Sequence, residues 1–311
     1  MALCGIDLGG TKCLGIVIDD GEVVAEARVP TPSGTGALVA ELVGMVELLG
    51  RTAAIDAVGV GAPGLVDRGG VLRVAPNLAV EQGLELRAVL EEALSLPVVV
   101  DNDATCAAWG EREIGAASGF DDVILVTLGT GIGGGIISDG RLHRGANGFA
   151  GEIGHMVIDP QGPMCPCGQR GCWERFASGS GLGRLAREEV AGVAGPTRMV
   201  ELAGGDIDDV RGEHVTAAAA EDDALANQVL ARFGWWTALG LANLANIFDP
   251  QAFVLGGGLI RAGEAILAPT RAALVELSFG GGQRPEVTVV AAQLGEHAGA
   301  IGAAFLAGGD R

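Results

Sequence analysis

Three cysteines and one histidine stand close together in the middle of the sequence. Cys165, Cys167 and Cys172 fall within eight residues, and His155 precedes the first of them by ten. Three thiolates and one imidazole form a complete tetrahedral ligand set for Zn²⁺, and the glycines after Cys167 allow the backbone to wrap around a metal. Because four protein ligands leave no open coordination position, we predict a structural zinc site. Redox-active thiols are the alternative interpretation.

Acids and amides suited to holding a hydroxylated ligand occur in two places. Asn102 and Asp103 end a predicted strand and open a predicted helix, the position where ligands bind in open α/β sheets. There Asp103 is a candidate general base toward a hydroxyl, and its alternative role is to cap the helix. Glu152 and Glu174 flank the cysteines with His155, and a polyol needs several such groups because each buried hydroxyl requires a partner. If one ring nitrogen of His155 binds zinc, the other can address a sugar hydroxyl.

Two glycine-rich loops follow predicted strands and are suited to binding phosphate. The first is Gly9-Gly10-Thr11-Lys12, which holds the only lysine of the sequence, and the second begins Gly129-Thr130-Gly131. Glycines let backbone N–H groups approach an anion, and Lys12 adds a positive charge. We predict two phosphate loops that face each other across a cleft. For both loops the alternative is a purely structural turn.

Other glycine motifs narrow the choice of nucleotide-binding fold. The second loop contains G-x-G-x-x-G, but a predicted strand follows it where a dinucleotide-binding motif requires a helix. Neither a P-loop motif nor the H-R-D and D-F-G motifs of protein kinases occur. A third run, Gly256-Gly257-Gly258, follows a predicted strand, and its flat backbone can seat an adenine or a ribose, or form a plain turn.

The composition excludes several classes of partner. The 311 residues include 39 acidic and 20 basic ones, a net charge of −19, and no basic cluster offsets it. We therefore expect no nucleic acid and no anionic membrane as a partner. The N-terminus lacks the features of a secretory signal, no apolar run is long enough to span a bilayer, and six cysteines do not make a disulfide scaffold. These features predict a soluble cytoplasmic protein.

Periodicity and turn residues predict two α/β halves. Strands are predicted at 3–8, 14–18, 22–28, 57–60, 97–100, 123–128, 133–138, 252–255 and 286–290, and helices at 36–49, 84–94, 104–114, 179–191, 222–248, 264–277 and 298–306. The strand–glycine loop–strand unit at the N-terminus recurs about 120 residues later, and each copy ends in Asp-Gly. We predict a smaller domain over 1–115, a larger domain over 116–295, and a C-terminal helical segment, 296–311, that packs back on the first.

With these residues in view, the chain resembles the ROK family of sugar kinases, and within it the bacterial glucokinases. The resemblance spans nearly the whole chain. It rests on the runs 7–12 (DLGGTK), 100–104 (VDNDA), 128–135 (LGTGIGGG) and 151–155 (GEIGH), and on the block C-x-C-G-x-x-G-C-x-E at 165–174. The last block is the most specific, since many actin-like ATPases share the glycine loops.

The resemblance implies an actin-like ATPase fold, in which two ribonuclease-H-like domains close over an interdomain cleft, and transfer of phosphate from ATP-Mg²⁺ to the 6-hydroxyl of glucose. It makes Asp103 the catalytic base and gives Asp7 a place beside magnesium. The sugar contacts are Asn77, Asn102, Asp103, Glu152, His155 and Glu174, although Asn77 can equally be a turn residue. The nucleotide contacts are Gly9, Gly10, Thr11, Lys12, Thr130, Gly131, Gly256 and Gly257. The zinc ligands are His155, Cys165, Cys167 and Cys172.

Several alternatives stay open at this point. The substrate can be another hexose or an N-acetylhexosamine, and the donor can be polyphosphate, although a long polyanion calls for a basic groove that the sequence lacks. The same body also serves sugar-responsive repressors, which carry a helix-turn-helix ahead of the first phosphate loop. An actin-like filament or scaffold would need neither the cysteines nor the acids. A homodimer or homotetramer fits the resemblance.

Overall fold

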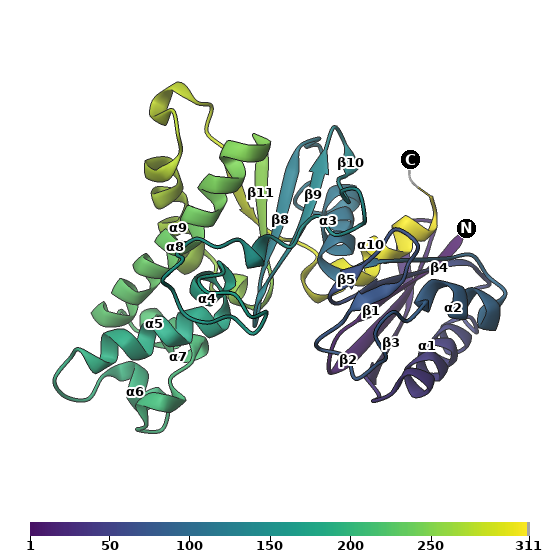
Figure 1. Cartoon of the computed structure of the whole chain (residues 1–311), viewed down its shortest axis with the longest axis horizontal. Coiled ribbons are helices and arrows are strands. Elements are labelled where there is room, and N and C mark those ends of the chain that lie inside the picture. Colours follow the sequence, from purple (N-terminus) through teal and green to yellow (C-terminus); the bar gives the residue numbers. More distant parts are fainter. Residues whose placement is uncertain (310–311) are drawn as a thin grey trace. The chain divides into compact units, whose positions relative to one another are not determined.

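The computed structural model describes residues 1–309 and contains two five-stranded sheets. The first sheet has the order β3-β2-β1-β4-β7, and the second has the order β10-β9-β8-β11-β12 (Figure 1). The strands of the first sheet are β1 (Ala2–Leu8), β2 (Lys12–Asp19), β3 (Glu22–Pro30), β4 (Ile55–Ala62) and β7 (Val98–Asn102). Those of the second are β8 (Val123–Leu128), β9 (Ile132–Ser138), β10 (Arg141–Leu142), β11 (Ala252–Gly256) and β12 (Thr288–Ala291).

Both sheets arrange their five strands in the same order along the chain: third, second, first, fourth, fifth. In the first sheet β1 is antiparallel to β2 and parallel to β4, which is parallel to β7. This shared topology confirms the internal repeat and the actin-like fold built on two ribonuclease-H-like sheets. Each hairpin turns on Asp-Gly with positive φ at both residues, 49° and 85° at Asp20-Gly21 and 51° and 71° at Asp139-Gly140. Such a turn matches the twist of paired strands, which is why the dipeptide marks a hairpin in both copies.

The helices follow the predicted ranges closely where the apolar pattern is long. They are α1 (Thr35–Leu49), α2 (Leu86–Leu94), α3 (Asp103–Ile114), α4 (Glu174–Ala177), α5 (Gly179–Ala191), α6 (Arg198–Leu202), α7 (Gly212–Ala220), α8 (Ala224–Phe248), α9 (Glu264–Leu277) and α10 (Ala298–Ala307). The sequence did not predict α4, α6 and α7, nor the short hairpin of β5 (Leu65–Val66) and β6 (Leu72–Val74), because such short segments carry little periodicity. Within the described part of the chain, no helix combines the length and apolar character needed to cross a bilayer.

The chain forms two compact units, each of which is built from more than one segment of the sequence. Unit 1 comprises Met1–Leu125, Gly135–Gly151 and the segment from Gln293 onward, and unit 2 comprises Val126–Gly134 and Glu152–Ala292. Strands β8 and β9 therefore contribute residues to both units. In unit 2, α8 packs along α9.

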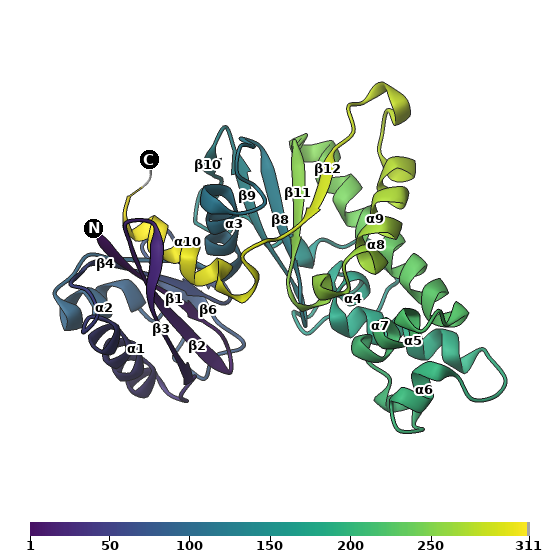
Figure 2. The same ribbon diagram turned by 180° about the vertical axis from the view of Figure 1, so that it is seen from behind.

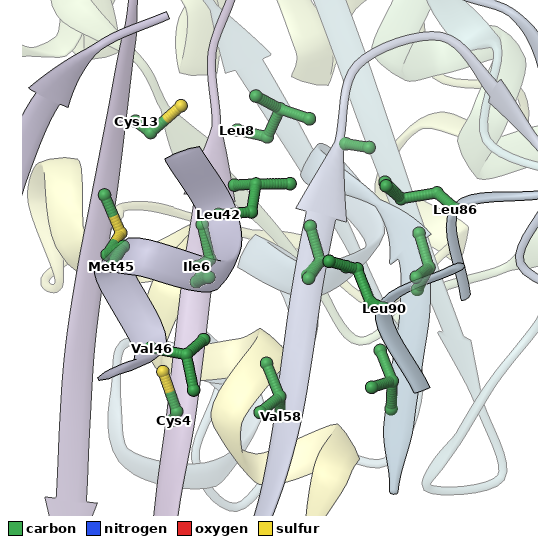
Figure 3. Packing of buried hydrophobic residues seen from close by; sticks show 14 of the residues in the cluster. Cys4, Ile6, Leu8, Cys13, Leu42, Met45, Val46, Val58, Leu86 and Leu90 are labelled. Atoms are coloured by element: carbon green, nitrogen blue, oxygen red, sulfur yellow. The ribbon is translucent and has the colours of Figure 1, made fainter. Parts of the chain in front are cut away.

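Unit 1 has a core on each face of its sheet. On one face, Ile6 and Leu8 of β1 pack against Leu42 and Met45 of α1 and Leu90 of α2, all buried (Figure 3). On the other face, α10 covers β1 and β4 (Figure 2). Successive strand residues point to opposite faces, so the apolar run of β1 from Ala2 to Ile6 fits a strand buried on both sides.

Glycines bring α10 close to its neighbours. A methyl group on Gly5 of β1 or Gly59 of β4 would collide with backbone carbonyl oxygens of α10, and one on Gly302 would collide with the Cys106 carbonyl oxygen of α3. The absence of side chains at these positions lets the helix backbone rest directly on the sheet and on α3. In this way the C-terminal helix becomes part of the N-terminal unit.

We expect Gly302→Ala to destabilise the protein by about 1–3 kcal/mol, because the new methyl group overpacks the α10–α3 contact. Gly44→Ala on the exposed side of α1, where a methyl group meets nothing within 4 Å, serves as the matched control. It should stabilise by about 0.5–1 kcal/mol, the ordinary gain of alanine over glycine in a helix. Urea unfolding measures both free energies, and a stabilising Gly302→Ala would contradict the close contact.

Candidate active site and metal centre

In unit 1, the first glycine loop is a tight turn between β1 and β2. The Gly9 N–H donates to the Lys12 carbonyl at 3.0 Å, and the Thr31 hydroxyl donates to the Gly9 carbonyl at 2.6 Å. Gly10 has no room for a side chain, since a methyl group there would lie 2.9 Å from the carbonyl oxygen of Asn77. The structure therefore places Asn77 against the first glycine loop, while Thr11 and Lys12 stay exposed.

Two carboxyl groups with raised pKa values lie at one edge of the first sheet. Asp7 is near the end of β1, and Asp103 follows β7 directly, so parallel pairing through β4 brings both to the carboxyl ends of their strands. Burial and, to a smaller extent, the negative charge of Asp103 raise the pKa of Asp7 to about 7, against the opposing effect of Lys12. Burial also raises the pKa of Asp103. The N-terminal turn of α10 presses on this edge, because a methyl group on Gly299 would lie 2.9 Å from the Asp7 carboxyl carbon.

The cap of α3 is Asn102, not Asp103, the residue that the sequence offered for this role. The Asn102 Oδ1 accepts the Thr105 N–H at 3.0 Å, and its Nδ2 donates to the Gly64 carbonyl at 3.1 Å. These bonds fix the amide, and a further hydrogen bond from the Asn102 side chain to Asp103 partly opposes the rise in the pKa of that acid. Asp103 is instead the first residue of the helix, and its Oδ1 accepts the N–H of the next residue at 2.8 Å.

A buried ion pair that the sequence did not reveal supports the same turn. Asp101, which is 6% exposed, accepts the N–H of Asn102 at 2.8 Å and the Arg144 Nε–H at 2.6 Å. The acid stands in the recognised motif, but nothing in the sequence pairs it with an arginine 43 residues later. Together Arg144 and the backbone amide hold Asp101, and hence the start of α3, in one arrangement.

In unit 2, the predicted zinc ligands come together. The Nδ1 or Nε2 of His155 and the Sγ atoms of Cys165, Cys167 and Cys172 offer ligand atoms that all lie within 4.8 Å of one another. The Cys167 and Cys172 Sγ atoms are 3.6 Å apart, and the Cys165 Sγ lies 3.9 Å from the His155 Nδ1. Burial raises the pKa of the Cys165 thiol, and a divalent cation among the sulfur atoms would favour its thiolate. The donor set and its spacing fit Zn²⁺.

The two ring nitrogens of His155 face different groups. Nδ1 faces the thiols and lies 4.0 Å from the Glu174 Oε1, whereas Nε2 lies 3.9 Å from the Glu152 Oε2. The Glu174 Oε1 also accepts from the Cys165 Sγ at 2.9 Å. The structure thus gathers Glu152, His155 and Glu174 around the cysteines, with one imidazole nitrogen directed away from the thiols.

Glu174 also contacts the second glycine loop. A methyl group on Gly131 would lie 2.6 Å from the Glu174 Oε2. Two hydrogen bonds from the first residues of α5 hold the loop. The Gly179 N–H donates to the Gly129 carbonyl at 2.7 Å, and the Ser180 hydroxyl donates to the Thr130 carbonyl at 2.9 Å. One carboxylate therefore lies between the cysteine cluster and the loop.

A cavity of about 1270 Å³ opens beside this loop within unit 2. Gly129, Thr130, Ser180 and Gly258 line it, and so do Arg187 and Arg211. Gly256 is instead buried in β11, and Gly257, with φ at 85°, packs against the backbone of Leu128. A third arginine, Arg261, also lines the cavity; the three come from separate parts of the chain, and no spacing in the sequence marks them.

We expect purified protein to contain about one equivalent of zinc per chain. Cys172→Ala should lose the metal and unfold at a lower temperature, because metal binding contributes to folding. Cys4→Ala, which removes a buried thiol of β1 outside the cluster, is the control and should keep its zinc. Elemental analysis and thermal unfolding give the two readouts; wild-type protein without bound metal would contradict the site.

The raised pKa of Asp7 makes the stability of the magnesium- and nucleotide-free protein depend on pH. Below pH 3.8, the ordinary pKa, the Asp7 carboxyl is protonated in both the folded and the unfolded protein. Between pH 3.8 and about 7 it ionises only on unfolding, so the free energy of unfolding falls as the pH rises through this range. We expect Asp7→Asn to stabilise by about 1–3 kcal/mol at pH 8 and hardly at pH 4. Asp20→Asn at the exposed hairpin turn is the control, and its effect on the free energy of unfolding should be the same at both pH values. Urea unfolding at the two pH values tests this, and a pH-independent effect at Asp7 would refute the assignment.

Comparisons with known proteins agree with this geometry. The model of the ROK family matches residues 3–309. The chain is 42% identical to a glucokinase of Streptomyces coelicolor over 97% of its own length and 96% of the relative's, and 34% identical to a glucokinase of Thermotoga maritima over 98% and 97%. A crystal structure of a ROK family glucokinase from Streptomyces griseus, in complex with glucose and AMPPNP, is 40% identical, covers both chains completely and superposes with a TM-score of 0.87. The chain belongs to the ROK family.

Proposed function

We propose that this chain is an ATP-dependent glucokinase, which transfers the γ-phosphoryl group of ATP to the 6-hydroxyl of glucose. The observation that carries the proposal is an end-to-end similarity to glucokinases, one of them solved with glucose and AMPPNP. The chain keeps the groups that such a reaction needs. A half-buried acid begins α3, glycine loops follow β1 and β8, and the cysteine–histidine cluster has two carboxylates beside it.

Asp103 acts as the general base in this proposal. Its burial raises the pKa of the carboxyl, which makes the carboxylate a stronger acceptor for the hydroxyl proton as attack proceeds. The Asn102 cap and the Asp101–Arg144 pair hold the start of α3, so the base is fixed before substrate arrives. Positioning of this kind supplies much of the acceleration in phosphoryl transfer, because the transition state is loose.

The other predicted contacts divide between sugar and nucleotide. The proposed sugar contacts are Asn77, Asn102, Asp103, Glu152, His155 and Glu174. The proposed nucleotide contacts are Gly9, Gly10, Thr11, Lys12, Thr130, Gly131, Gly256 and Gly257, with Asp7 at the magnesium ion of ATP. That ion would offset phosphate charge beside the half-buried acids. In the cluster, zinc bound through Nδ1 of His155 would leave Nε2 to address a sugar hydroxyl.

The cavity in unit 2 supports a nucleotide as the donor. Its volume of about 1270 Å³, beside the second glycine loop, leaves room for a nucleoside, which a polyphosphate donor would not use. Three arginines, Arg187, Arg211 and Arg261, line it in a chain that is otherwise strongly acidic. The oligomeric state implied by the family resemblance, a homodimer or homotetramer, stays a prediction, and so does a cytoplasmic location.

We expect Asp103→Asn to lower kcat by at least about 100-fold, because the amide cannot accept the proton. Glucose affinity, measured by calorimetry, should change only a few-fold, since the amide keeps the size and polarity of the acid. Glu113→Gln on the same helix removes a carboxylate without touching the site and should keep wild-type turnover.

The assay couples glucose 6-phosphate formation to a dehydrogenase and compares ATP with polyphosphate, and glucose with mannose, fructose and N-acetylhexosamines. Near-normal kcat in Asp103→Asn would overturn the assignment of the base. Preference for another sugar or for polyphosphate would replace the proposed substrates.

A further inference from the structure

The segment that leads into α10 is anchored by one buried carboxylate of unit 1. Glu111 of α3 is fully buried, and its two oxygens accept the N–H groups of Gln293 and Leu294 at 2.8 to 3.1 Å and that of Ala116 at 2.7 Å. Three backbone donors therefore compensate the buried charge. The next residues, Gly295–His297, form a short 3₁₀ turn that is fixed at its start by these bonds.

Glu296 of this turn bridges two cations on the neighbouring hairpin. Its Oε2 accepts from the Lys12 Nζ at 3.1 Å and from the Arg28 Nη1 at 2.8 Å, and its Oε1 accepts from the Arg28 Nη2 at 3.1 Å. The Arg28 guanidinium thus binds the carboxylate with both nitrogens, whereas the Lys12 ammonium makes one contact. The hydrogen bonds from Arg28 and then Lys12 lower the pKa of Glu296 to about 2, so the group is charged at neutral pH.

Lys12 is the only lysine of the chain and belongs to the first glycine loop, where the proposed function requires it to meet phosphate oxygens. It cannot use its full charge there while it stays paired with Glu296. The pair is accessible to solvent, with 61% of the Lys12 side chain and 40% of the Glu296 side chain exposed. An exposed pair of this kind is weak, and a polyanionic phosphate can displace it.

We propose that Glu296 is a positioning residue that holds Lys12 while the nucleotide is absent and releases it to the phosphates when the nucleotide binds. The inference rests on the proposed function. Arg28 makes the exchange feasible, because its two hydrogen bonds keep the carboxylate paired after Lys12 leaves. Glu296 therefore competes with the nucleotide for Lys12, and the anchored turn keeps the competitor in place.

The test is a double-mutant cycle on nucleotide affinity, measured by calorimetry with the full-length protein and AMPPNP-Mg²⁺ at low ionic strength. We expect Glu296→Gln to tighten binding about two- to fivefold, as expected when a weak exposed pair no longer competes. In a Lys12→Met background the same substitution should have little effect. Glucose affinity should not change. About 0.5 M salt should reduce the difference in nucleotide affinity between Glu296→Gln and the wild type, because salt screens the charges.

Glu26→Gln is the matched control. Glu26 bonds to Arg28 at 2.7 Å and lies 2.9 Å from the His297 Nε2, so its loss removes an equal charge from the same patch without touching Lys12. Tightening equal to that of Glu296→Gln would indicate a general charge effect and overturn the proposal. So would an unchanged or weaker affinity in Glu296→Gln, or tightening that persists in Lys12→Met.

Wild-type turnover with ATP and glucose, measured on the same preparation, separates the two levels of inference. If the protein binds AMPPNP-Mg²⁺ but does not phosphorylate glucose, the proposed function fails while the cycle still reports on Lys12. If it phosphorylates glucose and the cycle shows no coupling, only the role of Glu296 fails.

Discussion

Two half-buried acids at one edge of a sheet are the constraint around which unit 1 is organised. Asp7 and Asp103 lie where β1 and α3 meet that edge. Burial raises the pKa of both carboxyl groups, and the charge of Asp103 raises that of Asp7 as well. Desolvated carboxylates are unfavourable unless a cation or hydrogen-bond donors compensate them. The surroundings provide such groups: Lys12 lowers the pKa of Asp7, and a backbone N–H binds Asp103. In the proposed function, the magnesium ion of ATP would supply that compensating positive charge.

Close backbone packing holds this edge together. Because glycines line the contacts of α10 with β1, β4 and α3, the helix rests near enough for Gly299 to touch the Asp7 carboxyl group. Glu111 fixes the entry to the same helix through two backbone donors, the N–H groups of Gln293 and Leu294. The last helix of the chain thus takes part in shaping a site whose acids come from its first strand and from the start of α3.

Unit 2 couples its own parts through Glu174. One oxygen of this carboxylate accepts from the Cys165 thiol, and the other lies against Gly131 of the second glycine loop. Trp173, the residue before it, is fully buried, donates from Nε1 to the Trp236 carbonyl at 2.9 Å and packs on Gly240 of α8. The cysteine cluster and the loop therefore share the Glu174 side chain, and the residue before it ties this segment to the long helix.

The sequence by itself determined the features that depend on short spacing. Asp-Gly turns set both hairpins, the repeated strand–loop–strand unit showed the duplication, and Cys165, Cys167, Cys172 and His155 lie near one another because few residues separate them. Long apolar patterns gave the main helices and strands, whereas the five residues of α6 were too few to show a period.

Only the tertiary structure decided which distant groups meet. Glu296 reaches Lys12 across 284 positions and Arg144 reaches Asp101 across 43, and no local pattern encodes either pair. Asn102 caps α3 because its amide finds two partners, the Thr105 N–H and the Gly64 carbonyl. Gly64 is distant in sequence, so the residues around the helix start do not predict which of them caps it. Local spacing determines the helices, the strands and those ligand groups that lie a few residues apart. Contacts between distant residues depend on how closely the elements approach, and around α10 glycines set that distance.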